Sequence, residues 1–239
     1  MELEKKLIAS IEGYDNLVKN VCIGITWTAI ESRFAGLSHT YQTTEKTDIA
    51  NAGDLTSFTA AELAKRILSW KPLDASIGVA AINSLVESSG EKGNVKDFIM
   101  DKVRGKVVTM VGRFPFYNEI AAIARKLYLL EINPIGEELP AFACEEVIPK
   151  SDMNLITGTA LINHSLQRLL ELGQNGYNIV LGPTTPLSPV LFDFGADIVA
   201  GAKITDYKAA SKSIMQGVRR AKKLQGVEPL CLFRKGIKI

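Results

Sequence analysis

The sequence predicts an α/β fold, in which a Rossmann-like, doubly wound, mostly parallel sheet is preceded by a smaller α+β unit. After residue 94, strand-like apolar segments alternate with helical patterns, as is typical of parallel βαβ units. Before residue 88, two extended segments come first and helical segments follow, which indicates an α+β layer. Residues 88–94 are rich in glycine, serine and charge and suit a linker. We therefore expect two domains, residues 1–93 and 94–239.

The smaller unit is predicted to hold two antiparallel strands and two helices. Residues 21–30 and 34–41 look like strands, and the short connection between them favours antiparallel pairing. Thr59 and Glu62 have the spacing of a capping box, which satisfies the first free N–H groups of a helix. Pro72 suits the first turn of the next helix. The small apolar face of that helix is suited to packing within the unit or across a homo-oligomer interface.

The larger unit is predicted to alternate strands and helices. Strands are expected at residues 107–111, 128–132, 154–157, 178–181, 198–202 and 230–233. Helical patterns are expected at residues 117–127, 161–172 and 206–224. Ligands of such parallel sheets bind beyond the carboxyl ends of the strands, so the turns at that edge are the candidate site.

Composition restricts the partners of the protein. The net charge of the 239 residues is only +2, so there is no electrostatic case for nucleic acid. No apolar run approaches the ~18 residues that span a bilayer, and a start containing Glu2 and Glu4 lacks the pattern of a signal peptide. Three widely spaced cysteines do not suggest disulfides. We expect a cytoplasmic protein with a small-molecule ligand, and we interpret the basic run 219–223 as the complement of a helix dipole.

The turn after the predicted strand 154–157 is the first candidate binding element. It reads Thr157-Gly158-Thr159. A plain turn with Thr159 capping the next helix explains it, and so does a helix N-terminus that offers free N–H groups to an anion. Asn163 either adds an amide to that site or lies exposed.

The loop after the predicted strand 178–181 is the second candidate element. Gly182 opens it, and Thr184 and Thr185 stand between two prolines. Proline stiffens a loop, and rigidity helps to hold binding groups in place. We favour a binding role over a plain turn.

The usual glycine pattern of a dinucleotide site is absent from the first turn of the larger unit. Only Gly112 is present, with Phe114 and Tyr117 where the other glycines would stand. Arg113 is expected to face an anion or the other domain. Glu131 lies where this fold often bonds a ribose hydroxyl, and a surface or capping carboxylate is the other interpretation. The sequence leaves the cofactor open.

Metal-binding and nucleophile motifs are also absent. His39 and His164 are the only histidines, and no Cys or His pair has ligand spacing, so no protein metal site is expected. There is no G-x-S-x-G elbow and no P-loop. Acid–base work would therefore fall to a carboxylate such as Glu131 or Asp206, or to Lys203 if burial lowers its pKa, and for Asp206 we prefer the role of a helix N-cap.

Several motifs taken together resemble a known family. They are the Gly112-Arg-Phe-Pro-Phe116 turn, Glu131-Ile-Asn-Pro134, Ile156-Thr-Gly-Thr-Ala-Leu-Ile-Asn163, Gly182-Pro-Thr-Thr-Pro-Leu187, Phe192-x-x-Gly195, Ala200-Gly201, Gly24-Ile-Thr-Trp-Thr28 and Ala80-Ala-Ile-Asn83. The chain is similar over nearly its whole length to an uncharacterised family of proposed heavy-metal chelation proteins. The resemblance implies an enolase-N-terminal-like domain, a Rossmann-like domain, a pocket between them, and a link to chelator-, pterin- or flavin-like metabolites.

The leading hypothesis is an enzyme, a transferase or hydrolase, acting on a small heterocyclic or chelator-like metabolite by condensation, hydrolysis or group transfer. The expected binding residues are Thr157, Gly158, Thr159, Asn163, Gly182, Thr184, Thr185, Glu131, Asn133, Gly112 and Arg113, with Asn83 and Thr26 closing the pocket from the first domain. One alternative is a non-catalytic chelate or metabolite sensor. Another is an enzyme that uses S-adenosylmethionine or a nucleotide.

Overall fold

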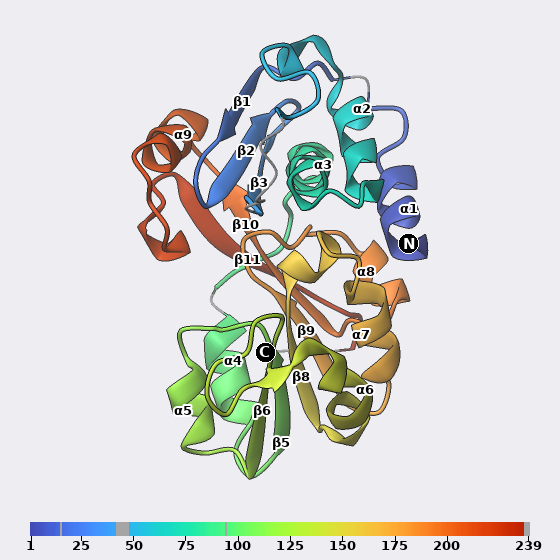
Figure 1. The fold of residues 1–239 in the computed structure, drawn as a ribbon, viewed down its shortest axis with the longest axis vertical. Helices are drawn as coiled ribbons and strands as arrows, with labels where there is room; N and C mark the ends of the chain where they lie inside the picture. Colours follow the sequence, from blue (N-terminus) through green and yellow to red (C-terminus); the bar gives the residue numbers. More distant parts are fainter. Residues whose placement is uncertain (15, 42–47, 94, 237–239) are drawn as a thin grey trace.

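The computed structural model describes residues 1–14, 16–41, 48–93 and 95–236. Within these residues the strands form two sheets, one of eight strands and one of three (Figure 1). The mixed α/β prediction is confirmed. No helix among the described residues is long and apolar enough to cross a membrane.

The large sheet has the order β4-β11-β10-β9-β8-β5-β6-β7. Its strands are β4 (Glu91–Lys92), β5 (Val107–Val111), β6 (Lys126–Glu131), β7 (Leu139–Pro140), β8 (Met153–Thr157), β9 (Tyr177–Leu181), β10 (Ile198–Ile204) and β11 (Val227–Phe233). The strands from β5 to β10 are parallel, and β11 and β4 extend the sheet in antiparallel fashion. If the six parallel strands β5 to β10 are numbered 1 to 6 along the chain, their order across the sheet is 3-2-1-4-5-6. This is the Rossmann arrangement, and its switch point lies between β5 and β8.

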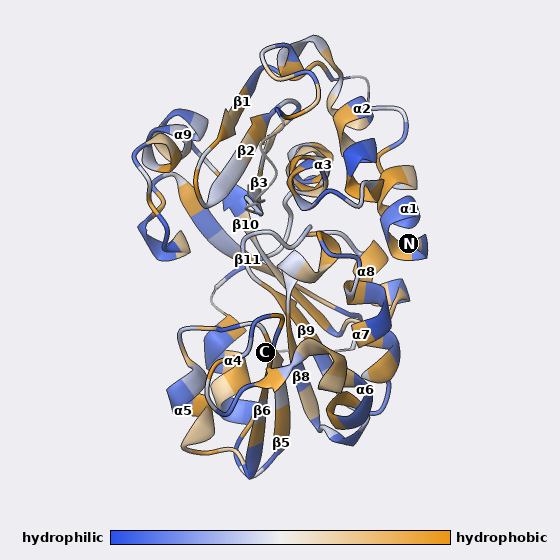
Figure 2. Ribbon diagram, viewed as in Figure 1, coloured by the Kyte–Doolittle hydropathy of each residue, from blue (hydrophilic) through white to orange (hydrophobic). Residues whose placement is uncertain are grey.

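Helices cover both faces of this sheet. One face packs against α4 (Val95–Lys102) and α5 (Tyr117–Ala121). The other packs against α6 (Cys144–Val147), α7 (Leu166–Leu172) and α8 (Val190–Asp193). Successive residues of β9 point to opposite faces, so Ile179 joins one core and Val180 the other. Strands buried on both faces read as continuous apolar runs, which Figure 2 shows for the central strands.

The three-stranded sheet packs between a helix on each side. It consists of β1 (Asn20–Ile23), β2 (Trp27–Glu31) and β3 (Ala35–His39), all antiparallel. The helices of the N-terminal region are α1 (Glu2–Ala9), α2 (Ala60–Ala64) and α3 (Pro72–Leu85), and α9 (Tyr207–Met215) comes from the C-terminal region. Helix α3 contacts β2 and β3, whereas α9 contacts β1 and β2 (Figure 1).

Two glycines permit this close packing. A Cβ atom on Gly36 would lie 2.6 Å from the carbonyl carbon of Asn83 in α3. A Cβ atom on Gly24 would lie 3.0 Å from the carbonyl oxygen of Ile214 in α9. Since both contacts are with backbone, neither helix can approach the sheet if these residues carry side chains.

The division of the chain into two domains near residue 93 stays a prediction.

Four predicted elements are wrong in their bounds. The helix expected at residues 117–127 ends at Ala121, and Lys126 already begins β6. The strand expected at residues 21–30 is the hairpin β1–β2, because the chain turns between Gly24 and Thr26. The helix expected at residues 206–224 ends at Met215, and Gly217 follows with φ +79°. The helix expected at residues 161–172 begins only at Leu166.

Candidate functional site

Two turns that are distant in the sequence meet at the carboxyl edge of the large sheet. Gly158 follows β8 and Thr185 lies just beyond β9, the neighbouring strand. A Cβ atom at position 158 would lie 2.8 Å from the backbone nitrogen of Thr185 and 2.9 Å from its Cα. These distances are too short for any side chain. Glycine at this position therefore lets the turns 157–159 and 182–185 lie against each other.

The same turns flank the switch point of the sheet. Gly112 ends β5 with φ +96°, a conformation that favours glycine. A Cβ atom there would lie 3.1 Å from the Cβ of Thr157. The hydroxyls of Thr157 and Thr159 are 3.0 Å apart. The Gly112 turn and the Thr157 turn are thus neighbours where ligands of this fold bind.

The predicted helix N-terminus after Thr157 is replaced by a shorter structure. Thr157, not Thr159, is the N-cap, and it begins a 3₁₀ helix over Gly158–Leu161. His164 then adopts a left-handed conformation with φ +61°. This conformation separates the 3₁₀ helix from α7. Because a macrodipole needs several aligned turns, the expected anion site at a long helix N-terminus is not formed here.

A pocket of about 1200 Å³ opens beside these turns. Its lining includes Thr157, Gly158 and Thr159 from one turn and Gly182, Pro183 and Thr184 from the other. Arg113, Phe114, Pro115 and Phe116, which follow β5, also line it. Strand β10 adds Ala200, Gly201 and Ala202. The volume suits a small organic molecule.

The three-stranded sheet contributes Trp27 and His39 to the lining of this pocket. The ring of His39 contacts those of Trp27 and Tyr41 edge-on, with centroids 5.8 and 5.9 Å apart. Burial lowers the pKa of His39 below its ordinary value, because burial disfavours the charged imidazolium. His39 is therefore neutral at pH 7 and able to accept a proton. The sequence indicated His39 only as one of two histidines, because its place beside the pocket depends on tertiary packing.

Cationic side chains dominate the charged part of the lining. Among the described residues, one carboxylate lines the pocket, that of Glu119, together with five cations, which are Arg113, Lys96, Arg219, Arg220 and Lys222. The basic run 219–223 was predicted to lie in the last turn of a long α-helix. Helix α9 ends earlier, at Met215, and the run contains only a single 3₁₀ turn over Ala221–Lys223. The helix-dipole interpretation of this run is wrong.

Thr184 joins the pocket to the N-terminal region. Its side-chain oxygen accepts a hydrogen bond of 2.9 Å from the backbone N–H of His39. The side-chain amide of Asn83 donates to the carbonyl oxygens of Leu37 and Thr184, at 2.8 and 3.1 Å. Asn83 therefore ties α3 to β3 and to the loop after β9, and it does not line the pocket.

Like Asn83, two of the predicted binding threonines, Thr185 and Thr26, lie outside the lining of the pocket. Thr185 is buried against Gly158, and its hydroxyl has no hydrogen-bond partner among the described residues. Thr26 lies in the β1–β2 turn, where its carbonyl oxygen accepts from the backbone nitrogen of Thr40 at 2.8 Å. Both residues support the shape of the site rather than face its cavity.

Arg113 organises a polar cluster beside the pocket. Its guanidinium donates to both carboxylate oxygens of Glu138, at 2.7 and 2.5 Å, and to the carbonyl oxygen of Asn133 at 3.0 Å. It also lies 3.7 Å from a carboxylate oxygen of Glu131. These hydrogen bonds lower the pKa of Glu138. The charge of Arg113 is thus already balanced, and the carboxylate of Glu131 faces Arg113 rather than the cavity.

Asn163 belongs to the same region. Its side chain lies near Tyr41, whose pKa is raised by burial and by nearby Glu131. The side-chain oxygen of Asn163 also accepts from the backbone nitrogen and hydroxyl of Ser165, at 3.1 and 2.7 Å. Asn163 is exposed and is not part of the lining of the pocket.

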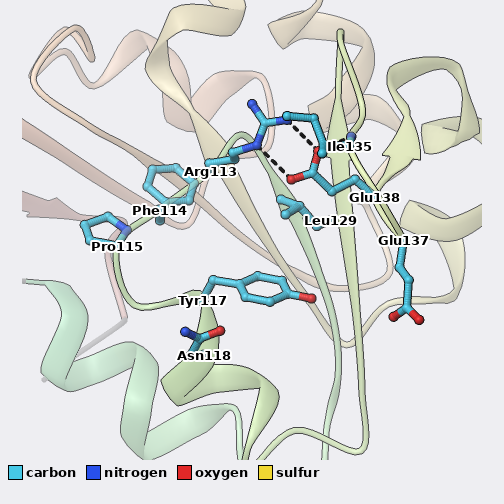
Figure 3. Close-up of a pocket in the computed structure, with 9 residues that line it drawn as sticks. All are labelled: Arg113, Phe114, Pro115, Tyr117, Asn118, Leu129, Ile135, Glu137 and Glu138. Atoms are coloured by element: carbon cyan, nitrogen blue, oxygen red, sulfur yellow. Dashed lines mark hydrogen bonds and ion pairs between the residues drawn. The ribbon is translucent and has the colours of Figure 1, made fainter.

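A second hollow of about 500 Å³ adjoins the larger pocket and shares Arg113, Phe114 and Pro115 with it. Figure 3 shows the Arg113–Glu138 pair at its rim and the ring of Tyr117 beside Leu129. Neither of the two threonine turns, residues 157–159 and residues 182–185, contributes to the lining of this hollow. We therefore assign the candidate site to the larger pocket.

The described residues do not provide a ligand set for a heavy metal. Among them there is no group of three His, Cys, Asp or Glu side chains that could hold an ion. Burial raises the pKa of the Cys22 and Cys231 thiols, so neither is a ready thiolate ligand.

Sequence and structure comparisons identify similar proteins. Two domain models described as "Putative heavy-metal chelation" match the chain, DUF4213 over residues 5–86 and DUF364 over residues 94–227. A crystal structure of a DUF364 protein of unknown function from Desulfitobacterium hafniense DCB-2 is 27% identical, with a TM-score of 0.87 and 98% of each chain covered.

Two more distant proteins extend the comparison. A DUF364 protein of unknown function from Pyrococcus horikoshii is 16% identical, with a TM-score of 0.74 over 97% of this chain and 98% of the other, a likeness that shows the fold alone. An uncharacterized protein of Methanocaldococcus jannaschii is 28% identical over 155 residues, and the match spans 59% of this chain and only 59% of that protein. Because the DUF364 model alone matches more than half of the residues, this chain belongs to the family described as "Putative heavy-metal chelation".

Proposed function

We propose that this protein binds a small heterocyclic or chelator-like metabolite in the large pocket and transforms it by condensation, hydrolysis or group transfer. One observation carries the proposal. Trp27 and His39 of the small sheet line the same cavity as the threonine turns of the large sheet. An aromatic ring, a neutral base and exposed turn backbone are the groups that bind a flat polar molecule and move its protons.

Each group has a defined role in the proposal. The ring of Trp27 provides a flat apolar wall for a heterocycle. The hydroxyls of Thr157 and Thr159 and the backbone beside Gly182 offer hydrogen bonds. His39 accepts a proton from the attacking group and returns it to the leaving group, since a neutral imidazole is suited to this exchange near pH 7.

The family description is compatible with this proposal in one particular way. A metal enters the pocket already held by an organic chelator, and the protein recognises the chelator. The scarcity of metal ligands among the described residues supports recognition of this kind over direct coordination.

The test starts from protein purified under native conditions. Mass spectrometry of the small molecules that co-purify with it identifies the ligand, and incubation with that compound measures turnover. We expect His39→Gln to keep the ligand and lose turnover by about 10²-fold or more. The matched control is His164→Gln, because His164 is the other histidine and does not line the pocket. Since His164 is paired with Glu4, turnover of both variants is compared below their melting temperatures.

Two results would contradict the proposal. If the ligand is returned unchanged under all conditions, the protein is a binding protein and not an enzyme. If Ala202→Phe, which fills the cavity beside β10 without changing charge, leaves ligand retention unaltered, the pocket is not the binding site.

A further inference from the structure

We propose that Arg219, Arg220 and Lys222 form an anion-binding subsite, which holds a phosphate or carboxylate group of the molecule bound in the large pocket. This inference rests on the proposed function and names the chemical class of its ligand. Three observations support it: the charge balance of the pocket lining, the fixed position of residues 219–224, and the open space at Gly182.

The charges of these three residues are unmatched within the described part of the chain. No ion pair joins any of the three to a carboxylate there, whereas the other cations of the lining are paired. Lys96 lies 2.7 Å from a carboxylate oxygen of Glu119, and Arg113 is bonded to Glu138. Since Glu119 is the one carboxylate among the described residues of the lining, the side of the pocket formed by residues 219–222 carries excess positive charge.

The segment that bears these cations is held in place by the N-terminal region. The indole N–H of Trp27 donates to the carbonyl oxygen of Arg219 at 3.1 Å. The backbone nitrogen of Lys223 donates to the carbonyl oxygen of Arg220 at 2.8 Å, closing a tight turn. Leu224 is buried in the same apolar cluster as Trp27. The backbone is therefore ordered before a ligand binds, which lowers the entropic cost of binding.

The loop after β9 leaves room for an anion to approach. Gly182 lines the pocket, and a Cβ atom at this position would meet nothing within 4 Å. The cavity lies between low-dielectric walls, and such a cleft concentrates the field of its cations on a bound anion. Two guanidinium groups and one ammonium group match a phosphate or a carboxylate, because arginine donates to such oxygens in a bidentate manner.

The subsite also gives the ligand a direction in the pocket. Trp27 anchors the cationic segment through Arg219 and lines the pocket together with His39. A ligand whose anionic group sits on the cations therefore has the rest of its body beside Trp27, near the base.

The test measures binding of pyrophosphate and of citrate to the full-length protein by isothermal titration calorimetry. The variant Arg219→Gln/Arg220→Gln/Lys222→Gln removes the subsite. The control Lys208→Gln/Lys212→Gln/Lys223→Gln removes the same charge from residues of α9 and the following turn that do not line the pocket. We expect affinity for at least one anion to fall at least about tenfold in the first variant and less than about twofold in the control. A preference for pyrophosphate or for citrate indicates a phosphate or a carboxylate ligand.

Equal affinities of the wild type and the first variant would overturn the subsite, as would the lack of measurable binding by the wild type at millimolar anion. Ala202→Phe separates this failure from failure of the proposed function. If Ala202→Phe loses the co-purified metabolite, the pocket is the binding site. If the triple arginine–lysine variant still retains the metabolite, only the subsite is overturned. Anion binding that survives Ala202→Phe but not the triple variant lies outside the pocket and overturns the inference as stated.

Discussion

The side-chain oxygen of Thr184 accepts a hydrogen bond from the backbone N–H of His39, with 2.9 Å between the two atoms. Thr184 belongs to the loop after β9, and His39 is the last residue of β3. One hydroxyl therefore fixes the small sheet, and with it the candidate base, against the carboxyl edge of the large sheet. The position of the imidazole depends on this contact.

Replacing Thr184 by valine keeps the shape of the side chain and removes the hydroxyl. Because the half-buried N–H of His39 then lacks this acceptor, we expect the free energy of unfolding to fall by about 1–2 kcal/mol. Urea denaturation measures this loss, and Thr184→Ser should recover part of it.

Thr185→Val is the matched control for that experiment. The Thr185 hydroxyl is buried without a partner among the described residues, so its removal should leave stability unchanged or raise it. Equal losses at the two positions would mean that the hydrogen bond to His39 is not what Thr184 contributes.

Gly158→Ala tests the contact between the two turns. The added methyl group meets the backbone of Thr185, and such overpacking typically costs about 1–3 kcal/mol. We expect a lower melting temperature together with weaker ligand binding. Gly93→Ala is the control for the melting temperature alone, because a Cβ atom there meets nothing within 4 Å, whereas Gly93 itself lines the pocket. A Gly158→Ala protein as stable as the control would show that the turns can separate without cost.

The parallel core was predictable from the sequence because its strands are buried on both faces. Continuous apolar runs mark residues 107–111 and 178–181, and neither needs knowledge of its neighbours. The last helix was predicted too long because Ala221 and Leu224 are apolar at helical spacing, yet they pack in the cluster around Trp27 as part of an irregular segment. Periodicity reports burial and does not distinguish a helix from a loop that packs equally well.

The candidate site was only half predictable for a related reason. The turns at Gly158 and Gly182 follow strands of one sheet, so their convergence follows from the rules of parallel topology. Trp27, His39 and Arg219 reach the pocket from an antiparallel sheet and a C-terminal segment. No local pattern encodes that docking, which depends on close packing at Gly24 and Gly36.

The lowered pKa of His39 predicts how stability changes with pH. Burial lowers this pKa in the folded state, so the unfolded chain, with an ordinary value near 6.5, binds the proton more readily. Stability is therefore greatest above about pH 6.5 and falls as the pH drops toward the folded-state pKa. Urea denaturation between about pH 7.5 and pH 5 should show a smaller decline for His39→Gln than for the wild type. Identical slopes would contradict a buried, neutral His39.

Glu4 and His164 form a buried pair between α1 and the segment before α7. Their side chains are 1% and 5% exposed, with 3.4 Å between the carboxylate oxygen and Nδ1. The other ring nitrogen lies 3.0 Å from the carbonyl oxygen of Ser69. Glu4→Ala leaves the Nδ1 of His164 without this hydrogen-bond partner, so we expect a loss of about 1–2 kcal/mol in the free energy of unfolding. The control Glu2→Ala, at an exposed position of the same helix, should change it little, and similar losses would rule out the pair as the cause.

Removal of metal should not change the stability of this protein. The described residues hold no cluster of three potential ligands, and their buried thiols have raised pKa values, so folding energy does not come from coordination. We expect the melting temperature to be the same before and after EDTA, and Zn²⁺ or Ni²⁺ alone to leave it unchanged. A ligand that binds only the folded state raises the melting temperature, and the stabilisation grows with the logarithm of its concentration above the Kd. A chelate recognised through its organic part should therefore act where the free ion does not. A melting temperature that falls with EDTA and returns with one metal would contradict this and would mean that the chain itself coordinates the ion.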